Sequence, residues 1–158
     1  MAETALSGAT HPILENDYAS EWMGIEVLAL SDGHATIRMT LRQEMLNGFG
    51  MAHGGMIFAF GDTAFALACN PIHPAPGEEG TITVASGVDI NFLKPAFRGQ
   101  VLTAVADRRS SAGRSGLYDI QIFAADAAAP AAEGQPSSST PGELIAEFRG
   151  RSRTIPKK

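Results

Sequence analysis

Cysteine, charged residues and aromatic residues are all scarce in this chain. Its 158 residues include one cysteine, 18% charged residues and 7% aromatic residues. A single cysteine excludes an internal disulfide, so the chain suits a reducing compartment. The net charge is -5, and no basic run occurs except the last two lysines. This argues against nucleic acid as the main partner, because phosphate binding needs clustered lysine and arginine.

Long uninterrupted apolar runs are also absent. The N-terminal segment lacks both a basic start and a continuous apolar stretch, so no signal peptide is predicted. The most apolar segment follows His53, but Gly61 and Asp62 interrupt it and it falls short of a membrane span. We therefore expect a single soluble, cytoplasmic domain over residues 1–158, long enough to bury a hydrophobic core.

The hydrophobic pattern predicts an α+β fold. Residues 54–69 are rich in alanine and apolar on all sides, which predicts a buried helix. Residues 34–42 alternate between apolar and polar, which predicts a half-buried strand with Ala35, Ile37, Met39 and Leu41 on its inner face. A partner strand is predicted at 24–30, and a short helix is predicted before it at 15–24. Four further strands are predicted at 81–95, 100–109, 116–125 and 143–155. A buried helix followed by consecutive antiparallel strands is typical of the α+β class.

Two stretches fall outside this regular pattern. Residues 71–80 are a loop rich in proline and glycine, and residues 126–143 are low-complexity alanine, serine and proline sequence. The composition of the second stretch predicts a mobile loop, since it offers little apolar surface to bury. The alternative is a functional lid, because long loops often carry function.

One carboxylate, Asp62, interrupts the apolar helix, and burying it is costly unless it is paired or functional. Gly54 and Gly55 begin the same helix, where unpaired N–H groups suit a developing oxyanion. Asp62 follows Gly54 by about 12 Å along the axis, too far to act on the same atom in one chain. Two helices packed antiparallel about a two-fold axis would bring the two groups together. The alternatives are a local partner for Asp62 and a merely flexible glycine loop.

The segment "LNGFGMAHGGMIFAFGDTAFALACN" (46–70) closely resembles the signature of hotdog-fold acyl-CoA thioesterases of the phenylacetate-degradation (PaaI) type. The resemblance continues in "ENDYASEWMGIEV", "VASGVDINFLKPAFRG", "GLYDIQIF" and "AEFRGRSRTI". It implies a long helix wrapped by a curved antiparallel sheet, and a homodimer with shared active sites, often paired into a homotetramer. It also implies hydrolysis of an aryl or medium-chain acyl-CoA, without a metal or cofactor.

The resemblance assigns roles to five residues of this signature. Asp62 matches the catalytic carboxylate, which acts as general base on water or as nucleophile. Gly54, with Gly55 beside it, matches the helix N-terminus that polarises the thioester carbonyl. His53 matches the residue that orients this carbonyl, and Asn47 matches the residue that positions the attacking water.

Other residues are secondary candidates. The resemblance implies basic residues around the mouth of the pocket, which makes four side chains candidates for the phosphates of coenzyme A: Lys94, Arg98, Arg149 and Arg151. Solvated surface is the alternative for each of them. Ser86 lies on a predicted central strand, and its hydroxyl is a candidate substrate contact. Gly61 stands where members of the family often carry alanine, and a glycine inside a helix costs roughly 1 kcal/mol.

Several conspicuous side chains are interpreted as structural. Cys69 lies near the C-terminus of the predicted helix, where the helix dipole disfavours a thiolate, so we expect a core cysteine. Three phenylalanines of the helix are expected in the core: Phe58, Phe60 and Phe65. Three histidines lack the spacing of metal ligands: His11, His34 and His73.

Two rival functions remain at this level. A hotdog dehydratase or hydratase would use a histidine with a carboxylate for proton transfer at carbon, but His53 is tied to the Gly-Gly position, which favours hydrolysis. A non-catalytic acyl-CoA-binding module would have no need of the buried carboxylate Asp62.

Overall fold

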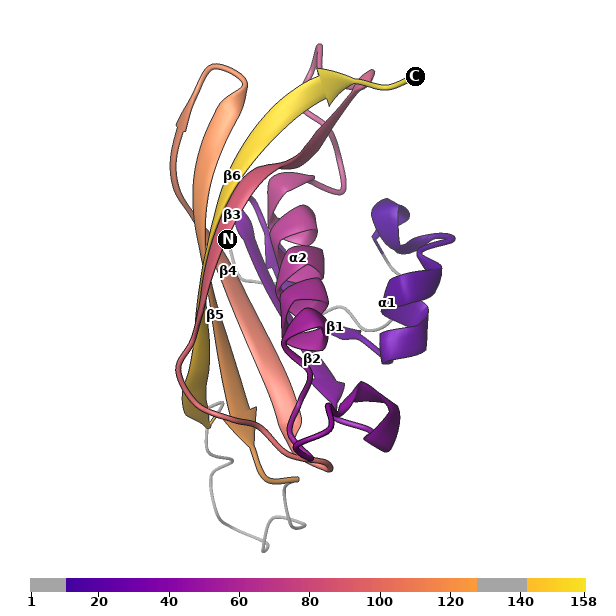
Figure 1. The fold of residues 1–158 in the computed structure, drawn as a ribbon. Helices are drawn as coiled ribbons and strands as arrows, with labels where there is room; N and C mark the ends of the chain where they lie inside the picture. Colours follow the sequence, from indigo (N-terminus) through magenta and orange to yellow (C-terminus); the bar gives the residue numbers. More distant parts are fainter. Residues whose placement is uncertain (1–10, 128–141) are drawn as a thin grey trace, which may run out of the picture.

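The computed structural model describes residues 11–127 and 142–158, and within them one antiparallel sheet of six strands packs against a long helix (Figure 1). The helical elements are the 3-10 turn η1 (Pro12–Leu14), α1 (Tyr18–Met23), the 3-10 turn η2 (Gln43–Met45) and α2 (Gly54–Cys69). The strands are β1 (Glu26–Ser31), β2 (His34–Thr40), β3 (Thr81–Phe92), β4 (Val101–Ala112), β5 (Ser115–Ala125) and β6 (Glu143–Pro156). The sheet curves around α2, and α1 lies on the far side of that helix (Figure 1). The predicted α+β class is confirmed.

The central helix α2 begins and ends at the predicted residues. At its start, the Nδ1 atom of the His53 side chain accepts the N–H of Gly55 at 2.9 Å, which caps the first turn. At its end, the Asn70 amide donates to the carbonyls of Ala66 and Thr83, both at 2.9 Å, and so ties the helix to β3. The face toward the sheet is buried, but Phe58, whose ring centroid lies 5.5 Å from that of Phe148 in β6, remains 38% exposed. The expectation of burial on most sides is therefore correct for only part of the helix.

The predicted hairpin of β1 and β2 is confirmed. Its inner face carries the expected residues Ala35, Ile37, Met39 and Leu41, all buried in the core. The preceding helix α1 is shorter than predicted, because the Asp17 carboxylate accepts the N–H of Ser20 at 3.0 Å and sets the first turn there. It ends at the expected glycine, Gly24, which has φ 71°.

Strand β3 lies at the edge of the sheet and pairs with β6, not with the next strand along the chain. The next strand along the chain, β4, pairs with β2 and β5 instead. Ser86 therefore belongs to an edge strand, and its interpretation as a residue of a central strand is wrong. Within the described part of the chain, no strand pairs with the other edge of β3. The turn between β4 and β5 is also tighter than predicted, because pairing continues to Ala112 and Ser115. Most of the loop predicted at 126–143 lies outside the described residues.

Gly61 occupies a place in α2 that leaves no room for a side chain. A Cβ atom built there would lie 2.9 Å from Cδ2 of Phe148 and 3.2 Å from Cδ1 of Ile122. Both side chains belong to the buried face of the sheet. Glycine therefore allows β6 to approach the helix closely, which explains the departure from alanine.

We expect Gly61→Ala to lower the melting temperature by a few degrees. Helix propensity alone predicts the opposite, a gain of about 1 kcal/mol. Overpacking a tight core typically costs about 1–3 kcal/mol, however, and neither Phe148 nor Ile122 has open space to move into. Thermal unfolding of both proteins measures the sign. A higher melting temperature in the variant would contradict the close contact.

Candidate functional site

Asn47 organises the loop that leads into α2. Its side-chain Oδ1 accepts the N–H groups of Phe49 at 2.9 Å and of Met51 at 3.2 Å. Its backbone N–H donates to the Met51 carbonyl at 2.7 Å, which closes a tight turn. Because Oδ1 is committed to two backbone donors, only the side-chain NH₂ group of Asn47 remains to contact a ligand.

The first turn of α2 presents one open backbone donor. The Gly55 N–H is occupied by Nδ1 of His53, and the next two N–H groups of the helix donate to the His53 carbonyl. Among the described residues, no acceptor is bound to the N–H of Gly54. Since Nδ1 of His53 accepts a hydrogen bond, the proton of the neutral ring lies on Nε2, which is exposed and able to donate. The two donors Gly54 N and His53 Nε2 thus come from neighbouring residues.

Phe92, the last residue of β3, lies over the start of this helix. A Cβ atom built on Gly54 would be 3.3 Å from Cζ of Phe92, so glycine permits this close approach. Phe92 is 52% exposed and lines a cavity of about 320 Å³ beside Gly54. The other walls are Met51, Ala52, Ile57, Leu93, Lys94 and Pro95.

Asp62 lies in the middle of α2 and is half-buried. Burial raises the pKa of its carboxyl group above the usual value, and the negative charge of Asp17 raises this pKa further. No group among the described residues donates a hydrogen bond to it. The alternative of a local cap or ion pair for Asp62 therefore finds no support in the described part of the chain.

Gly54, Phe58 and Asp62 follow one another at intervals of four residues and form a stripe along α2. The helix runs antiparallel to β3, since Gly54 lies against Phe92 near one end of the strand and Asn70 bonds Thr83 near the other. The chain thus places the open N–H and the carboxylate on one side of the helix, about 12 Å apart along its axis. It does not bring them together.

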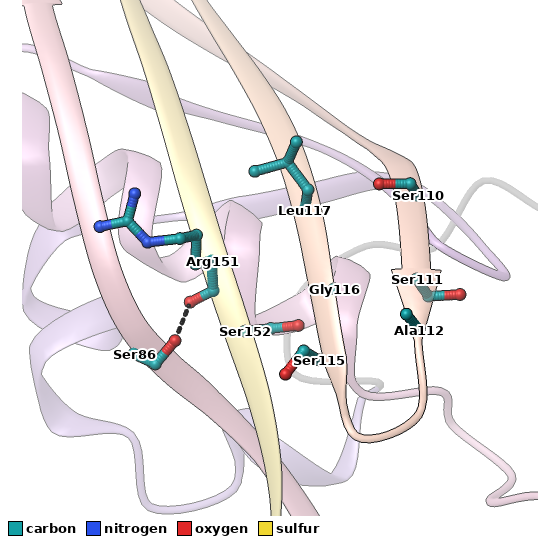
Figure 2. A pocket seen from close by; sticks show the side chains of 9 residues that line it. All are labelled: Ser86, Ser110, Ser111, Ala112, Ser115, Gly116, Leu117, Arg151 and Ser152. Carbon is teal, nitrogen blue, oxygen red and sulfur yellow. Dashed lines mark hydrogen bonds between the residues drawn. The ribbon is translucent and has the colours of Figure 1, made fainter.

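Ser86 and Arg151 lie elsewhere on the sheet. Ser86 sits at a bulge of β3, and its hydroxyl donates to the Arg151 carbonyl at 3.0 Å (Figure 2). They share a shallow cavity of about 360 Å³ with serines of the β4–β5 hairpin. Phe92 follows Ser86 by six positions of extended strand, a span of roughly 20 Å. Within one chain, Ser86 is therefore remote from Gly54.

The candidate basic residues are dispersed. Lys94 forms an ion pair with Glu143 at the cavity beside Gly54. Arg98 donates to the Gln43 side chain at 3.2 Å. Arg149 pairs with Asp119 at 2.8 Å, and Arg151 lies 3.7 Å from Asp89. Because Phe148, Gly150 and Ser152 of β6 are buried beneath α2, the alternating Arg149 and Arg151 point to the opposite face of the sheet.

Cys69 is partly buried and packs against the core. Burial raises the pKa of its thiol to about 12, despite the nearby hydroxyls of Tyr118 and Ser152. A thiol with this pKa is protonated at neutral pH and is a poor nucleophile. Two of the three helix phenylalanines, Phe60 and Phe65, are buried as predicted, whereas the core assignment of Phe58 is only partly correct.

We expect Cys69→Ala to keep kcat for the expected thioester hydrolysis within roughly twofold of the value for the unaltered protein. The protonated thiol is not expected to act as a nucleophile in this reaction. Loss of the side chain from a packed position should lower the melting temperature slightly. Steady-state kinetics and thermal unfolding measure the two effects separately. A hundredfold loss of kcat in a folded variant would reinstate Cys69 as a nucleophile.

Two of the described histidines serve as structural groups. His11 donates from Nε2 to the Asn70 carbonyl at 2.6 Å, and His34 contacts Asp107 at 2.7 Å. In residues 11–127 and 142–158, no group of three or more histidine, cysteine or acidic side chains is placed to hold a metal ion. No helix in the same residues is long and apolar enough to cross a membrane.

Sequence reasoning missed the positions of Phe58 and Phe92 near the site. Both occur in ordinary apolar patterns, one on a helix and one on a strand, and these patterns predict core residues. Only the packing of β3 against the start of α2 shows that Phe92 borders Gly54.

Comparisons with known proteins point to one family. The model of the thioesterase superfamily matches residues 49–131. The acyl-coenzyme A thioesterase PaaI of Escherichia coli is 41% identical over 92% of this chain and 88% of its own. The structure of the E. coli PaaI protein from the phenylacetic acid degradation operon superposes with a TM-score of 0.71 at 36% identity, over 90% of this chain and 88% of that one. A variant of the phenylacetic acid degradation protein PaaI from Thermus thermophilus gives a TM-score of 0.67 at 28% identity, over 87% of this chain and 98% of that one.

These matches confirm the resemblance that the segment 46–70 predicted, including the hotdog fold and the thioester-hydrolase class. The match to E. coli PaaI extends over nearly the whole length of both proteins. The chain belongs to the thioesterase superfamily and is a homologue of the E. coli acyl-coenzyme A thioesterase PaaI.

Proposed function

We propose that this protein hydrolyses the thioester of aryl or medium-chain acyl-CoA substrates to the free acid and coenzyme A, at sites shared between two copies of the chain. The observation that carries the proposal is the stripe on α2, which joins an open N–H at Gly54 to an unpaired carboxylate at Asp62 within the described residues. The similarity to PaaI thioesterases supports the same reaction.

The start of α2 is suited to hold the thioester carbonyl. The Gly54 N–H and the Nε2–H of His53 are two donors that can bind the carbonyl oxygen as it becomes an oxyanion. The partial positive charge of the helix N-terminus adds to their effect. Gly55 contributes indirectly, because its N–H holds the His53 ring in place.

Asp62 is suited to activate water. The water oxygen attacks the carbonyl carbon, while Asp62 takes a proton from the water and the NH₂ group of Asn47 holds its oxygen. The tetrahedral intermediate then breaks its C–S bond, and coenzyme A leaves with the proton. A carboxyl group whose pKa is raised is a stronger base once ionised, which suits this role. Direct attack by Asp62 is the alternative, and transfer of ¹⁸O from labelled water into Asp62 in a single turnover distinguishes the two.

A second copy of the chain completes the site in this proposal. The two-fold axis that brings Asp62 of one copy to Gly54 of the other passes beside Phe58, midway between them in sequence, and Phe58 is exposed in the single chain. The unpaired edge of β3, within the described part of the chain, offers a twelve-residue strand for pairing with its copy. The apolar side chain of Val84 in this strand is also exposed, at 38%. Pairing of two dimers into a homotetramer and a cytoplasmic location remain predictions.

The roles of the outlying residues also remain predictions. Lys94 borders the Gly54 cavity, which makes it the nearest candidate for a phosphate of coenzyme A. Three other candidates could reach this site only from another copy of the chain in an assembly: Arg98, Arg151 and Ser86. A dehydratase is less well supported, since Nδ1 of His53 is occupied by Gly55 and cannot serve as its base.

The proposal is tested by measuring thiol release from benzoyl-, phenylacetyl- and hexanoyl-CoA. We expect turnover of at least one of them above roughly 1 s⁻¹, within the usual range of enzymes. Tight binding of all three without thiol release would favour a binding module. Release of water or its addition to an enoyl-CoA, in place of thiol release, would favour a hydratase.

A further inference from the structure

The cavity beside Gly54 is lined mostly by apolar side chains, which limits the kind of ligand group that it can bind. Its volume is about 320 Å³, and its walls include Met51, Ala52, Ile57, Phe92 and Leu93. Lys94 is the one charged side chain of the lining among the described residues, and its ammonium group is already paired with Glu143. Ligand pockets commonly measure about 300–1,000 Å³, so this one suits a single ring or a short chain.

A carbonyl held by the Gly54 N–H must direct one of its two substituents toward this cavity. The substituent on sulfur is the pantetheine arm, which carries two amide groups that need hydrogen-bond partners. The substituent on carbon is the acyl group, which is apolar in the proposed substrates. Walls built mostly of carbon favour the acyl group, because they leave no polar group unpaired.

Phe92 stands out among these walls. Its ring lies over Gly54, where an added Cβ would approach Cζ to 3.3 Å, and about half of its surface is open. Its backbone is fixed by pairing with Ala146 of β6, at the end of a twelve-residue strand. An aromatic side chain on a backbone fixed in this way, next to the carbonyl donor, is placed to contact a ring carried by the acyl group.

We propose that Phe92 is the specificity-determining residue for the acyl group, and that it favours aryl over straight-chain substrates. The inference rests on the proposed thioesterase function, since it assumes that the substrate carbonyl binds at Gly54. The aryl ring packs against Phe92 within the cavity, while its carbonyl oxygen accepts the Gly54 N–H. A flexible alkyl chain of similar size fills the same space without the ring-to-ring contact.

The test compares kcat/KM for phenylacetyl-CoA and hexanoyl-CoA in the unaltered protein and in Phe92→Leu, which keeps an apolar side chain but removes the ring. We expect the ratio of the two values to fall roughly threefold to tenfold, the scale of an aromatic pair, and chiefly through KM for phenylacetyl-CoA. Phe92→Tyr retains the ring face and should preserve the ratio. Phe97→Leu is the matched control, because Phe97 is 49% exposed and does not line the cavity, and its ratio should not change.

An unchanged ratio in Phe92→Leu, or an equal loss with both substrates, would overturn the role of Phe92 while leaving the thioesterase function intact. Hydrolysis of neither substrate by the unaltered protein would overturn the function and this inference together. If Phe92→Leu does not fold, loss of the aryl preference in Phe92→Tyr would count against the proposal, and its retention would support it.

Discussion

Asp62→Asn should lower kcat at least roughly 100-fold, the usual scale for the loss of a general base. The variant keeps the size of the side chain and removes only the charge that activates water. The α2 packing should survive, since Asp62 forms no hydrogen bond with the described residues. Steady-state thiol release with phenylacetyl-CoA measures the effect.

A matched control separates the catalytic charge from charge in general. Asp107→Asn removes a carboxylate on β4 that contacts His34 and forms no hydrogen bond or ion pair with Gly54 or Asp62, so it should leave kcat nearly unchanged. Turnover of Asp62→Asn close to that of the unaltered protein would exclude Asp62 as base or nucleophile.

The raised pKa of Asp62 gives the same experiment a pH dependence. The base must be ionised, so kcat/KM should be constant above this raised pKa and fall as the pH drops through it. Because burial and Asp17 raise the pKa, the fall should begin above the pH at which an ordinary carboxyl group titrates. In Asp62→Asn, the fall of kcat/KM at low pH should disappear, in addition to the overall loss of activity.

The raised pKa of Asp62 also predicts how the stability of the folded protein changes with pH. A carboxyl group whose folded pKa is raised binds protons more tightly in the folded state, so its ionised form disfavours folding. At pH values above the raised pKa, Asp62→Asn should therefore unfold at a higher temperature than the unaltered protein. This advantage should shrink as the pH falls through the raised pKa and disappear below the pKa of the unfolded chain. Gain of stability with loss of activity would mark Asp62 as retained for function.

Mixing two inactive variants should restore activity if the site is shared between copies. The first variant is Asp62→Asn. The second is Gly54→Pro, which removes the open N–H and should lower kcat roughly 100- to 1,000-fold. Proline is tolerated at the first helical position, and His53 has ψ 132°, an extended conformation that permits a following proline. The half-exposed ring of Phe92 has room to yield to the added atoms.

A mixed dimer combines one intact Gly54 with one intact Asp62 at a single site, and loses both groups at the other. After complete exchange of equal amounts, half of the dimers are mixed, so about a quarter of the original activity should return. Native mass spectrometry of isotopically labelled subunits confirms the exchange. Exchange without recovery of activity would show that Gly54 and Asp62 do not act on the same substrate molecule.

Much of the fold was predictable from the sequence because its signals are local, whereas the roles of the candidate site residues stay predictions. The length and alanine content of 54–69 and the two-residue pattern of 34–42 are properties of one continuous segment each, and both predictions were confirmed. Asp62 was conspicuous for the same reason, as a charge among apolar neighbours. The distance between Gly54 and Asp62 followed from helix geometry alone, and it is the basis of the prediction that a second copy of the chain brings the two groups together.

Tertiary structure decided what depends on contacts between distant segments. Pairing of β3 with β6 closes a long stretch of chain, and nothing within β3 specifies that partner, so Ser86 was placed on the wrong kind of strand. The contact of Phe92 with Gly54 joins residues from two elements, as does that of Phe148 with Gly61. The structure also shows which backbone N–H at the start of α2 is open. The His53 side chain accepts the N–H of Gly55, so the N–H of Gly54 is the one that has no acceptor among the described residues. Periodicity along the chain determines which face of an element is apolar, but packing alone determines which residue of another element meets it.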